Sequence, residues 1–570
     1  MNIRSKLTAL FAGVCMVSSA YLPAYAAEAD NKQFETYLKD YVVAAAESDY
    51  TLMHQYFENP SAYGIDEKKC DVTLGTVLPD KEDKALQKEL SERLEKIDPK
   101  KLSSDYQQMY AQLEWEFDLS ERLTQSKFLY LKNIWSSLSG LPQNLVTFFS
   151  EYELRQEKDI QPLITLINDV PRAAKDAIDY TKKQADKKTL MFDYDTTAKF
   201  CRNVVDTKKN SAVTAELMKD IDGLKLSKEK TAQYKKQVTE ALNKSFFPAF
   251  QTIQDELKPL SKKTRKVTGL TALPDGKEYY EVLAEQATGT IDTPDEICAN
   301  LQEAILDLAD EHDESVRIDK LKTSFTSVED IMKFLNRNYK KDFPDVGEMK
   351  YELQALADEQ SQEGVVAYFL IPAVDSTATY KIRYNKRDYG DDPEALSLYD
   401  TMAHEGIPGH MYQAQYNRKN LKQPAQYLFD CLGFTEGYAV YASTKALAWL
   451  DLTEKEREAY IADDLMQNYT IVLLDYKINY EGMSQKEFID IFGEPNLPLY
   501  NQIADNPTAF LSYYYGYLQI DQLEAKAMKK LGKNYKNADF VNALLKAGNV
   551  NFEIIKDNVD AYISRAAKKA

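Results

Sequence analysis

The sequence has few cysteines, few glycines and prolines, and only four histidines. The first two shortages limit the kinds of site and fold that the chain can have. Five cysteines are present, and none forms a CxxC pair, so the chain has no metal or redox motif of that type. With only 20 glycines and 19 prolines, and with many lysines, glutamates, alanines and leucines, the composition favours helix. No stretch beyond the N-terminus is long and apolar enough to span a membrane.

Positive charge is also in short supply. The chain has 71 lysines and arginines against 90 aspartates and glutamates, a formal net charge of −19. Loss of Arg4 and Lys6 with a leader peptide would lower this to −21. A surface of this charge repels nucleic acid and anionic membranes, so we expect neither as a partner.

The N-terminus has the pattern of an export signal. A cationic start is followed by an apolar run at 7–22 and by the small-x-small cleavage site Ala24-Tyr25-Ala26. We therefore expect residues 1–26 to be a signal peptide. Residues 27–570 would then form the exported chain, either secreted or held in the cell envelope or periplasm.

Cys15 lies within the expected leader. It follows Val14, where a lipid-attachment site usually has a small residue, so a lipoprotein is disfavoured. The other four cysteines are far apart in the sequence. In an exported protein they could form up to two disulfides, with three pairings open, or remain buried free thiols. These four are Cys70, Cys201, Cys298 and Cys431.

Apolar residues at helical spacing recur along most of the chain and predict a mainly helical fold. Two β-rich stretches, 365–371 and 378–385, predict a small sheet. We expect one large helical unit, which could divide into an N-terminal helical part at 27–263 and a second part at 264–570. The predicted helices lie at about 31–57, 82–97, 103–124, 142–183, 209–221, 228–257, 293–313, 327–338, 454–480, 512–530, 536–546 and 551–567.

Two of the four histidines lie six residues apart in the stretch 404–410, HEGIPGH. Histidine is the commonest protein ligand for zinc, and a neighbouring carboxylate such as Glu405 can act as a base. The familiar zinc-protease signature places its histidines four residues apart, on one helical face. At a spacing of six, an unbroken helix would point His404 and His410 about 120° apart.

Two residues between the histidines change that geometry. Pro408 has no amide hydrogen to donate to the carbonyl of His404, and Gly409 tolerates backbone angles that other residues avoid. We therefore predict a helix that carries His404, a break, and a second segment that presents His410. The stretch 391–393, DDP, is expected to cap the first helix and to place proline at its first position.

Glu436 is the only charged residue in the apolar and aromatic stretch 434–442. A lone carboxylate in such surroundings is costly unless it is paired or bound to a cation. It would suit a third zinc ligand on a helix that follows the histidine pair. The alternative is a glutamate at the exposed end of a core helix.

Other polar residues carry weaker signals. The stretch 512–517, SYYYGY, puts four tyrosines in five positions on a helix, so most of them must pack. One, Tyr513 or Tyr514, could donate a hydrogen bond to a developing oxyanion, as could Arg383. His312 stands among three acids, and we interpret that stretch as a solvated helix.

Four stretches resemble a bacterial family known as domain of unknown function 885, whose members look like zinc metallopeptidases of the glutamate-zincin type. The resemblance covers nearly the whole chain after the leader. The matching stretches are Tyr384-Asn385, the 404–410 motif with Gln413, Glu436-Gly437-Tyr438-Ala439-Val440-Tyr441, and Ser512-Tyr513 with Gly516.

The resemblance implies a largely helical fold around a deep cleft, with a small sheet beside the metal. It also implies His404, His410 and Glu436 as zinc ligands, Glu405 as general base and Tyr513 as a catalytic tyrosine. There are two departures from the family pattern. Tyrosine stands at 438 where tryptophan is usual, and asparagine stands at 479 where histidine is common.

We therefore expect an exported peptidase that binds one Zn²⁺ per chain and hydrolyses short peptides. Arg383, Tyr384, Asn385 and Tyr514 are the candidate substrate-binding residues, and the strand at 378–386 could hold an extended peptide by main-chain pairing. Two alternatives stay open: a peptide- or metal-binding protein without turnover, and another zinc amide hydrolase that acts on cell-wall peptides. The sequence does not indicate oligomeric state or endo- versus exopeptidase action.

Overall fold

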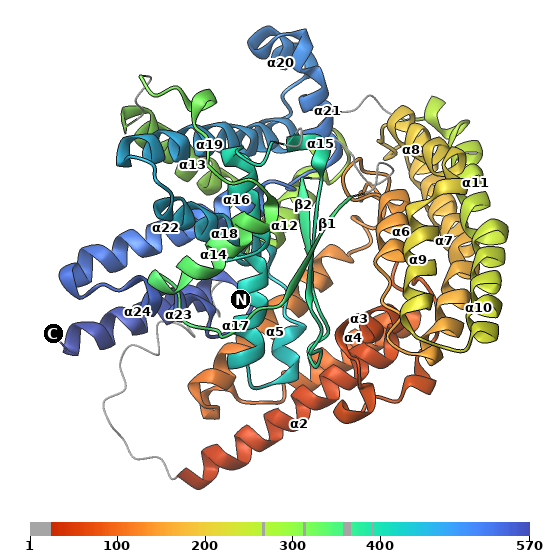
Figure 1. Cartoon of the computed structure of the whole chain (residues 1–570), viewed down its shortest axis with the longest axis horizontal. Helices are drawn as coiled ribbons and strands as arrows, with labels where there is room; N and C mark the ends of the chain where they lie inside the picture. The colour runs from red at the N-terminus through yellow and green to blue at the C-terminus, as the bar shows by residue number, and fades with distance from the viewer. Residues whose placement is uncertain (1–23, 265–267, 312–314, 357–365, 390–391, 570) are drawn as a thin grey trace.

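A computed structural model of the chain describes residues 24–264, 268–311, 315–356, 366–389 and 392–569. This part is mainly helical with one small sheet, as predicted (Figure 1). The expectations for Cys15, His312 and Asp391, and for the expected signal peptide up to residue 23, lie outside the described residues.

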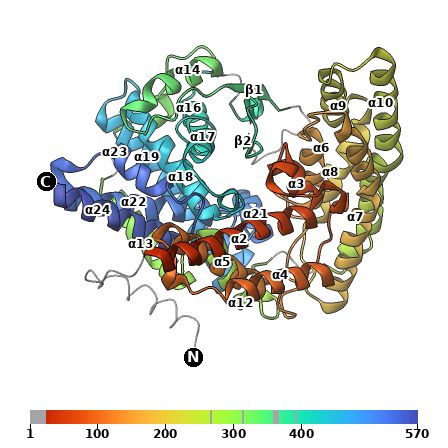
Figure 2. The same ribbon diagram turned by 90° about the horizontal axis from the view of Figure 1, so that it is seen from below.

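The first ten helices form two groups. Figure 2 shows α2, α4 and α5 along the lower side, and α6 to α10 stacked together at one end, where Figure 1 also places α11. The bounds are α2 (Ala24–Ser48), α3 (Tyr50–Tyr56), α4 (Lys81–Leu94), α5 (Ser104–Leu123), α6 (Leu141–Ser150), α7 (Ile160–Lys187), α8 (Tyr194–Asp206), α9 (Ala212–Gly223), α10 (Lys228–Ala241) and α11 (Phe247–Leu257).

Most of the later helices fill the opposite side of the molecule in Figure 2. They are α12 (Gly276–Thr288), α13 (Pro294–Glu311), α14 (Val328–Asn338), α15 (Lys386–Tyr389), α16 (Leu396–Glu405), α17 (His410–Asn420), α18 (Leu432–Ala446), α19 (Glu454–Asp475), α20 (Gln485–Phe492), α21 (Leu497–Asp505), α22 (Leu511–Leu531), α23 (Asn537–Leu545) and α24 (Phe552–Lys569).

Buried apolar residues form one main cluster that runs from Phe34 in α2 to Tyr562 in α24. Polar contacts follow the same path. The side-chain oxygen of Gln112 in α5 accepts the amide of Asn551 at 2.9 Å, just before α24 begins. Thus α5 packs with the C-terminal part of the chain. The division at residue 263 stays a prediction.

Two predicted helices are each interrupted by non-helical residues in the structure, whereas the predicted helix 228–257 is divided into α10 and α11 only by a π-helical turn at Leu242–Phe246. The stretch 31–57 breaks at Asp49, whose side chain accepts the amides of Thr51 and Leu52 and so begins a new helix. The stretch 142–183 becomes α6 and α7, because the carboxylate of Asp159 accepts the amides of two preceding residues and stops α7 from extending backward. Local capping thus overrides a continuous apolar period.

The helix that carries His404 begins later than predicted. Its first residue is Leu396 rather than Pro393, and Ala395 is its N-cap without a side-chain hydrogen bond. Ala395 forms an isolated bridge with Lys322, and the carbonyl of Glu394 accepts the amide of Thr323 at 2.8 Å. These contacts hold residues 394–395 against another segment, so the helix cannot start there.

The sheet has three strands in the order β1–β3–β2. The predicted pair is confirmed as β2 (Ala367–Leu370) and β3 (Tyr380–Tyr384), which run antiparallel. The sequence did not predict β1 (Tyr351–Ala355), which pairs parallel with β3. Because β3 has a strand on each side, the expectation that it holds a peptide by main-chain pairing is wrong.

All four cysteines after the expected leader are buried and free. Of the two alternatives for them, free thiols are therefore the one that the structure has. Within the described residues, no helix combines the length and apolar character needed to cross a membrane.

Helices α18 and α22 cross in very close contact, and glycines make the contact possible. A methyl group added at Gly437 would lie 2.3 Å from the backbone of Gly516, and one at Gly516 would lie 1.9 Å from the carbonyl oxygen of Gly433. Any side chain at these positions would force the two helices apart.

We expect Gly516→Ala to lower the free energy of unfolding by about 1–3 kcal/mol, because the added methyl group overpacks this crossing. Thermal and urea unfolding, followed by circular dichroism, measure the effect. Gly223→Ala at the end of α9 is the matched control, since no atom lies within 4 Å of its added methyl group. A Gly516→Ala protein as stable as the control would contradict the close-packing argument.

Candidate metal centre

His404 and Glu405 are the last two residues of α16. The helix is anchored by buried side chains such as Met402, and by Tyr399, whose hydroxyl donates to the carbonyl oxygen of Ala446 in α18 at 2.8 Å. The end of α16 is therefore fixed against α18, the helix that supplies the third candidate ligand.

The predicted break after Glu405 is confirmed. The peptide bond before Pro408 is cis, and this residue has no amide to continue the helical ladder. The amide of Gly409 donates instead to the carbonyl of Ala403 at 2.9 Å, and the amide of Tyr412 donates to the carbonyl of Gly406 at 3.1 Å. Both bonds span six residues rather than the four of an α-helix. The side chains of the second helix are therefore rotated relative to those that a continuous helix would give.

Gly409 is required by a close approach. A methyl group there would lie 1.8 Å from the carbonyl oxygen of His404, so no larger residue fits. The hydroxyl of Tyr438 in α18 donates to the carbonyl of Pro408 at 3.1 Å and holds the break in place. The family resemblance gives tryptophan at 438, and both tyrosine and tryptophan carry a hydrogen-bond donor at the ring edge.

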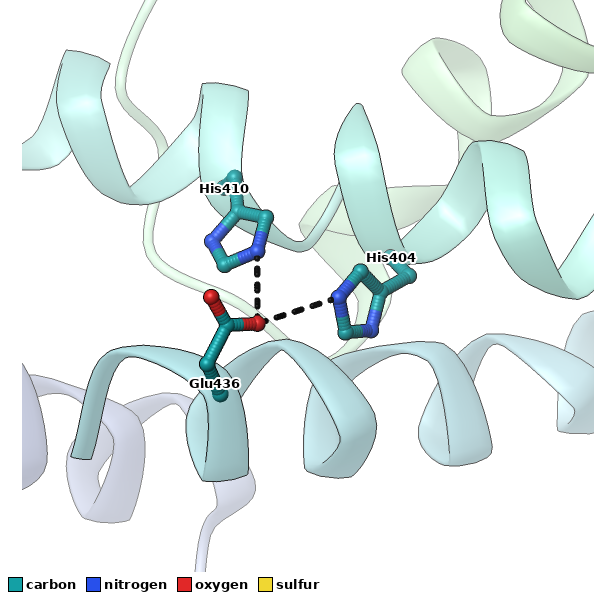
Figure 3. A group of neighbouring side chains, drawn as sticks. All are labelled: His404, His410 and Glu436. Atoms are coloured by element: carbon teal, nitrogen blue, oxygen red, sulfur yellow. Dashed lines mark ion pairs between the residues drawn. The ribbon is translucent and has the colours of Figure 1, made fainter. Parts of the chain in front are cut away.

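His404, His410 and Glu436 converge on one point (Figure 3). The Oε2 atom of Glu436 lies 3.5 Å from Nε2 of His404 and 3.3 Å from Nε2 of His410. One potential ligand atom from each of the three residues lies within 4.8 Å of the other two. The break between the two helices thus brings together histidines that an unbroken helix would separate.

The three side chains are mostly buried and strongly coupled. Burial favours the neutral form of His410, yet the carboxylate of Glu436 outweighs it and raises the pKa of His410 to about 9. Burial likewise favours the neutral form of Glu436, but His410 and His404 outweigh it and hold the pKa of that carboxyl well below its usual range. The arrangement therefore stabilises a negative charge on Glu436 beside a positive charge on His410.

The donor set fits Zn²⁺. The buried Oε2 atom of Glu436 has no well-aligned hydrogen bond to any described residue, although it faces two imidazole nitrogens. Two histidines and one glutamate are a common ligand set of catalytic zinc, and they leave a coordination position open. A cation at this point would satisfy the carboxylate and both imidazoles together.

Tyr513 in α22 lies directly beside this group. Its ring stacks on His404, with ring centres 6.1 Å apart and planes inclined by 16°. Burial, with the nearby carboxylates of Glu436 and Glu405, raises the pKa of Tyr513 well above its ordinary value. The phenol therefore stays protonated at neutral pH and can donate a hydrogen bond.

Tyr514 points to a different neighbourhood. Burial first, and then the carboxylates of Asp464 and Asp400, raise its pKa. Asp400 stands one turn before His404 on α16, and its carboxyl interacts with that histidine. Carboxylates behind a metal-binding imidazole often orient the ring. Tyr514 is thus placed behind the ligands rather than in front of them.

A cavity of about 420 Å³ opens beside the three converging residues. His410, Glu436, Glu405 and Tyr513 line one side of it. The other walls come from β2, from residues 371–374, from 426–430 and from the face of α17 that carries His410. Glu405 is close to the ligands as well, with its Oε1 atom 3.9 Å from Nε2 of His404.

Three of the candidate substrate-binding residues lie on or next to β3, and none of them lines this cavity. Arg383 is 4% exposed, and its guanidinium forms two hydrogen bonds of 3.0 and 3.1 Å with Glu151 at the end of α6. Asn385 is fully buried and accepts the amide of Arg387. Tyr384 pairs with Ala367 in the sheet. Tyr514 is likewise absent from the lining.

Asn479, where the family resemblance gives histidine, makes buried hydrogen bonds that join neighbouring segments. It is fully buried, its amide oxygen accepts the amide of Leu270 at 3.1 Å, and its nitrogen donates to Asp475 and to the carbonyl of Ile503. None of these residues lines the cavity. The departure from histidine therefore changes a packing contact between helices, away from the candidate ligands.

Sequence reasoning did not identify the residues of α17 that line the cavity. Gln413 was noted only as part of the family motif, while Ala414, Asn417 and Arg418 were not singled out. They follow His410 by three, four, seven and eight residues, the spacing of one helical face. Once α17 is known to begin at His410, this spacing identifies them.

Comparisons with known proteins place the chain among relatives of unknown function. The family described as "Bacterial protein of unknown function (DUF885)" matches residues 61–383 and 339–559. No functionally curated protein matches the chain.

Two solved structures share the fold. One is described as a "putative lipoprotein" from Colwellia psychrerythraea; it is 16% identical, has a TM-score of 0.79, and the match covers 94% of this chain and 99% of the other. The second, a "putative lipoprotein of unknown function" from Shewanella oneidensis, is 16% identical with a TM-score of 0.53, over 84% and 93%.

At this identity the likeness shows the fold alone, and the expectation about Cys15 stays a prediction. The family match covers most of the sequence, including every residue of the candidate metal centre. The chain therefore belongs to the bacterial DUF885 family, whose function is unknown.

Proposed function

We propose that this protein is a zinc-dependent peptidase of short peptides. The observation that carries the proposal is the convergence of His404, His410 and Glu436 beside a cavity that Glu405 and Tyr513 also line. Binding of a metal alone would need neither a spare carboxylate nor a protonated phenol facing the same cavity. Both are groups that amide hydrolysis uses.

Zn²⁺ held by His404, His410 and Glu436 would supply Lewis-acid chemistry, polarising a peptide carbonyl and making water more acidic. Glu405 is the general base in this proposal. Its carboxylate faces the cavity next to His404 and has room to accept a proton from an attacking water. The same residue, once protonated, can return the proton to the departing amine.

Tyr513 is proposed to donate a hydrogen bond to the oxyanion that forms at the attacked carbonyl. The close crossing of α18 and α22 fixes this phenol relative to Glu436, because Gly437 and Gly516 bring the two backbones together. A donor that is already in place when charge develops costs little reorganisation.

The cavity limits the substrate. A volume of about 420 Å³ is at the small end of ligand pockets and holds only a few residues of a peptide. The substrate in this proposal is therefore a short peptide or a flexible chain end rather than a folded protein.

Purified protein should contain about one zinc ion per chain, measured by elemental analysis after dialysis against metal-free buffer. His404→Ala should lose this zinc, because two protein ligands bind zinc far more weakly than three. His54→Ala is the matched control: His54 stacks on Tyr152, away from this group, and the variant should retain zinc. Equal zinc content in the two variants would contradict the assignment of His404 as a zinc ligand.

Glu405→Gln should retain zinc and lower the rate of peptide hydrolysis by roughly 10²–10⁴, the usual contribution of a general base. The rate is measured by mass spectrometry on a mixed library of short peptides. Unchanged turnover in this variant would remove Glu405 from the base role. Failure of the wild type to cleave any peptide in the library would contradict the peptidase proposal itself.

Tyr513→Phe should lower kcat by roughly 10²–10³ with little change in KM, because it removes a donor that acts on the transition state. Tyr514→Phe on the adjacent position should have a much smaller effect, since that phenol points toward Asp400 and Asp464. Steady-state kinetics on one cleaved peptide measures both. An equal loss in the two variants would argue that neither phenol has the assigned role.

A further inference from the structure

Helix α17 lines the cavity beside the candidate metal centre over more than two turns, from His410 to Arg418. His410 at the start of the helix faces the metal position, and Asn417 and Arg418 line the same cavity two turns later. At a rise of 1.5 Å per residue, eight residues separate His410 from Arg418 by about 12 Å along the axis. Both side chains tilt back toward the helix start, and the arginine side chain is the longer of the two, so the guanidinium can reach closer to the imidazole than this.

Arg418 is the only lysine or arginine among the described residues that line the cavity. Its Nη2 atom is buried and has no hydrogen-bond partner there, and no described carboxylate lies within ion-pair distance of its guanidinium. Buried polar atoms normally have a hydrogen-bond partner, so the Nη2 atom of Arg418 is an exception that a bound anion would explain.

The guanidinium is nevertheless held in place. Its Cζ atom lies 5.0 Å from the ring centre of Tyr380. The hydroxyl of Tyr380 donates to Gln415 on the adjacent turn of α17 at 2.7 Å, which fixes the ring. Stacking on an aromatic face orients the planar fork of an arginine and leaves its N–H groups free for an anion.

Asn417 adds a second unsatisfied group. It is 9% exposed, and its side-chain oxygen is buried without a hydrogen bond to any described residue. An amide beside a guanidinium can hydrogen-bond the last peptide group of a bound chain while the guanidinium pairs with a carboxylate. Two buried polar groups without partners, on one wall of one cavity, point to a polar ligand.

We infer that Arg418 binds the free C-terminal carboxylate of a peptide substrate, so that the enzyme removes short fragments from the carboxyl end. This inference rests on the proposed peptidase function. An extended peptide spans about 3.3–3.6 Å per residue, so the distance along α17 accommodates no more than about three residues beyond the scissile bond. The expected products are single residues to tripeptides, released from unblocked peptides.

The test is a binding measurement on the Glu405→Gln protein, which removes the proposed base. Fluorescence anisotropy follows three peptides of alanine labelled at the N-terminus: one with a free carboxylate, its C-terminal amide, and an amide that carries a glutamate side chain. The free acid should bind about ten- to hundred-fold more tightly than either amide, the range of a charge-assisted pair.

Arg418→Met should weaken binding of the free acid to the level of its amide and leave the amide unchanged. Arg418→Lys should give an intermediate affinity, because it keeps the charge without the planar fork. Lys422→Met is the matched control: it removes the same charge four residues later, at an exposed position outside the cavity lining, and should bind like the parent protein. Circular dichroism checks that each variant is folded.

Equal affinity of the parent protein for the free acid and its amide, or no measurable binding of the free acid, would overturn the inference without reference to any variant. Equal binding of the glutamate-containing amide and the free acid would overturn it too, because the recognised group would then be a side chain. Cleavage by the wild type separates the two proposals. Equal cleavage of the free acid and its amide would contradict the carboxylate subsite but not the peptidase function. Preferred binding of the free acid without any cleavage would contradict the peptidase function but not the subsite.

Discussion

A buried carboxylate needs compensating charge. Glu436 in α18 is such a carboxylate, and the helices around it must supply that charge. Its oxygen lies in the interior of a helical protein, where a lone negative charge would cost several kcal/mol. The two imidazoles that face it come from helices on either side of a backbone break. The break, the glycine at 409 and the tyrosine that holds Pro408 all serve to bring those two rings to one carboxylate.

The same requirement orders the neighbouring helices. α18 carries Glu436, contacts the end of α16 through Tyr399, and crosses α22 at glycines. Each contact fixes a different functional side chain: His404 through α16, and Tyr513 through α22. The candidate centre is thus built by helices that are each pinned to α18, and not by a flexible loop. Such rigidity suits a site in which polar groups must be in place before charge develops.

The sequence predicted the helical class, the small sheet, the helix break and the residues that converge with Glu436. These features depend on local signals: apolar spacing, a proline between two histidines, and one acid in an apolar stretch. Local capping at Asp49 and Asp159 divided two predicted helices, and long-range contacts set other features that were missed. The late start of α16 depends on pairing with Lys322 and Thr323, far away in the sequence. β1 becomes a strand only by pairing with β3. Arg383 is a cationic residue of the kind that can contact a substrate, but its charge is paired with Glu151, more than two hundred residues earlier in the sequence.

Under the proposed function, the placement of His410 and Arg418 on one continuous helix has a consequence for how relatives of this protein could diverge. A helix is stiff, and each of its turns adds 5.4 Å along its axis. Helix α17 would therefore fix the distance between the proposed metal position and the proposed carboxylate-binding position. Insertion or loss of one turn between the two residues would move the anchor by the length of one to two peptide residues. Relatives with the same metal motif and a longer or shorter first part of this helix would then release fragments of a different, equally fixed, length.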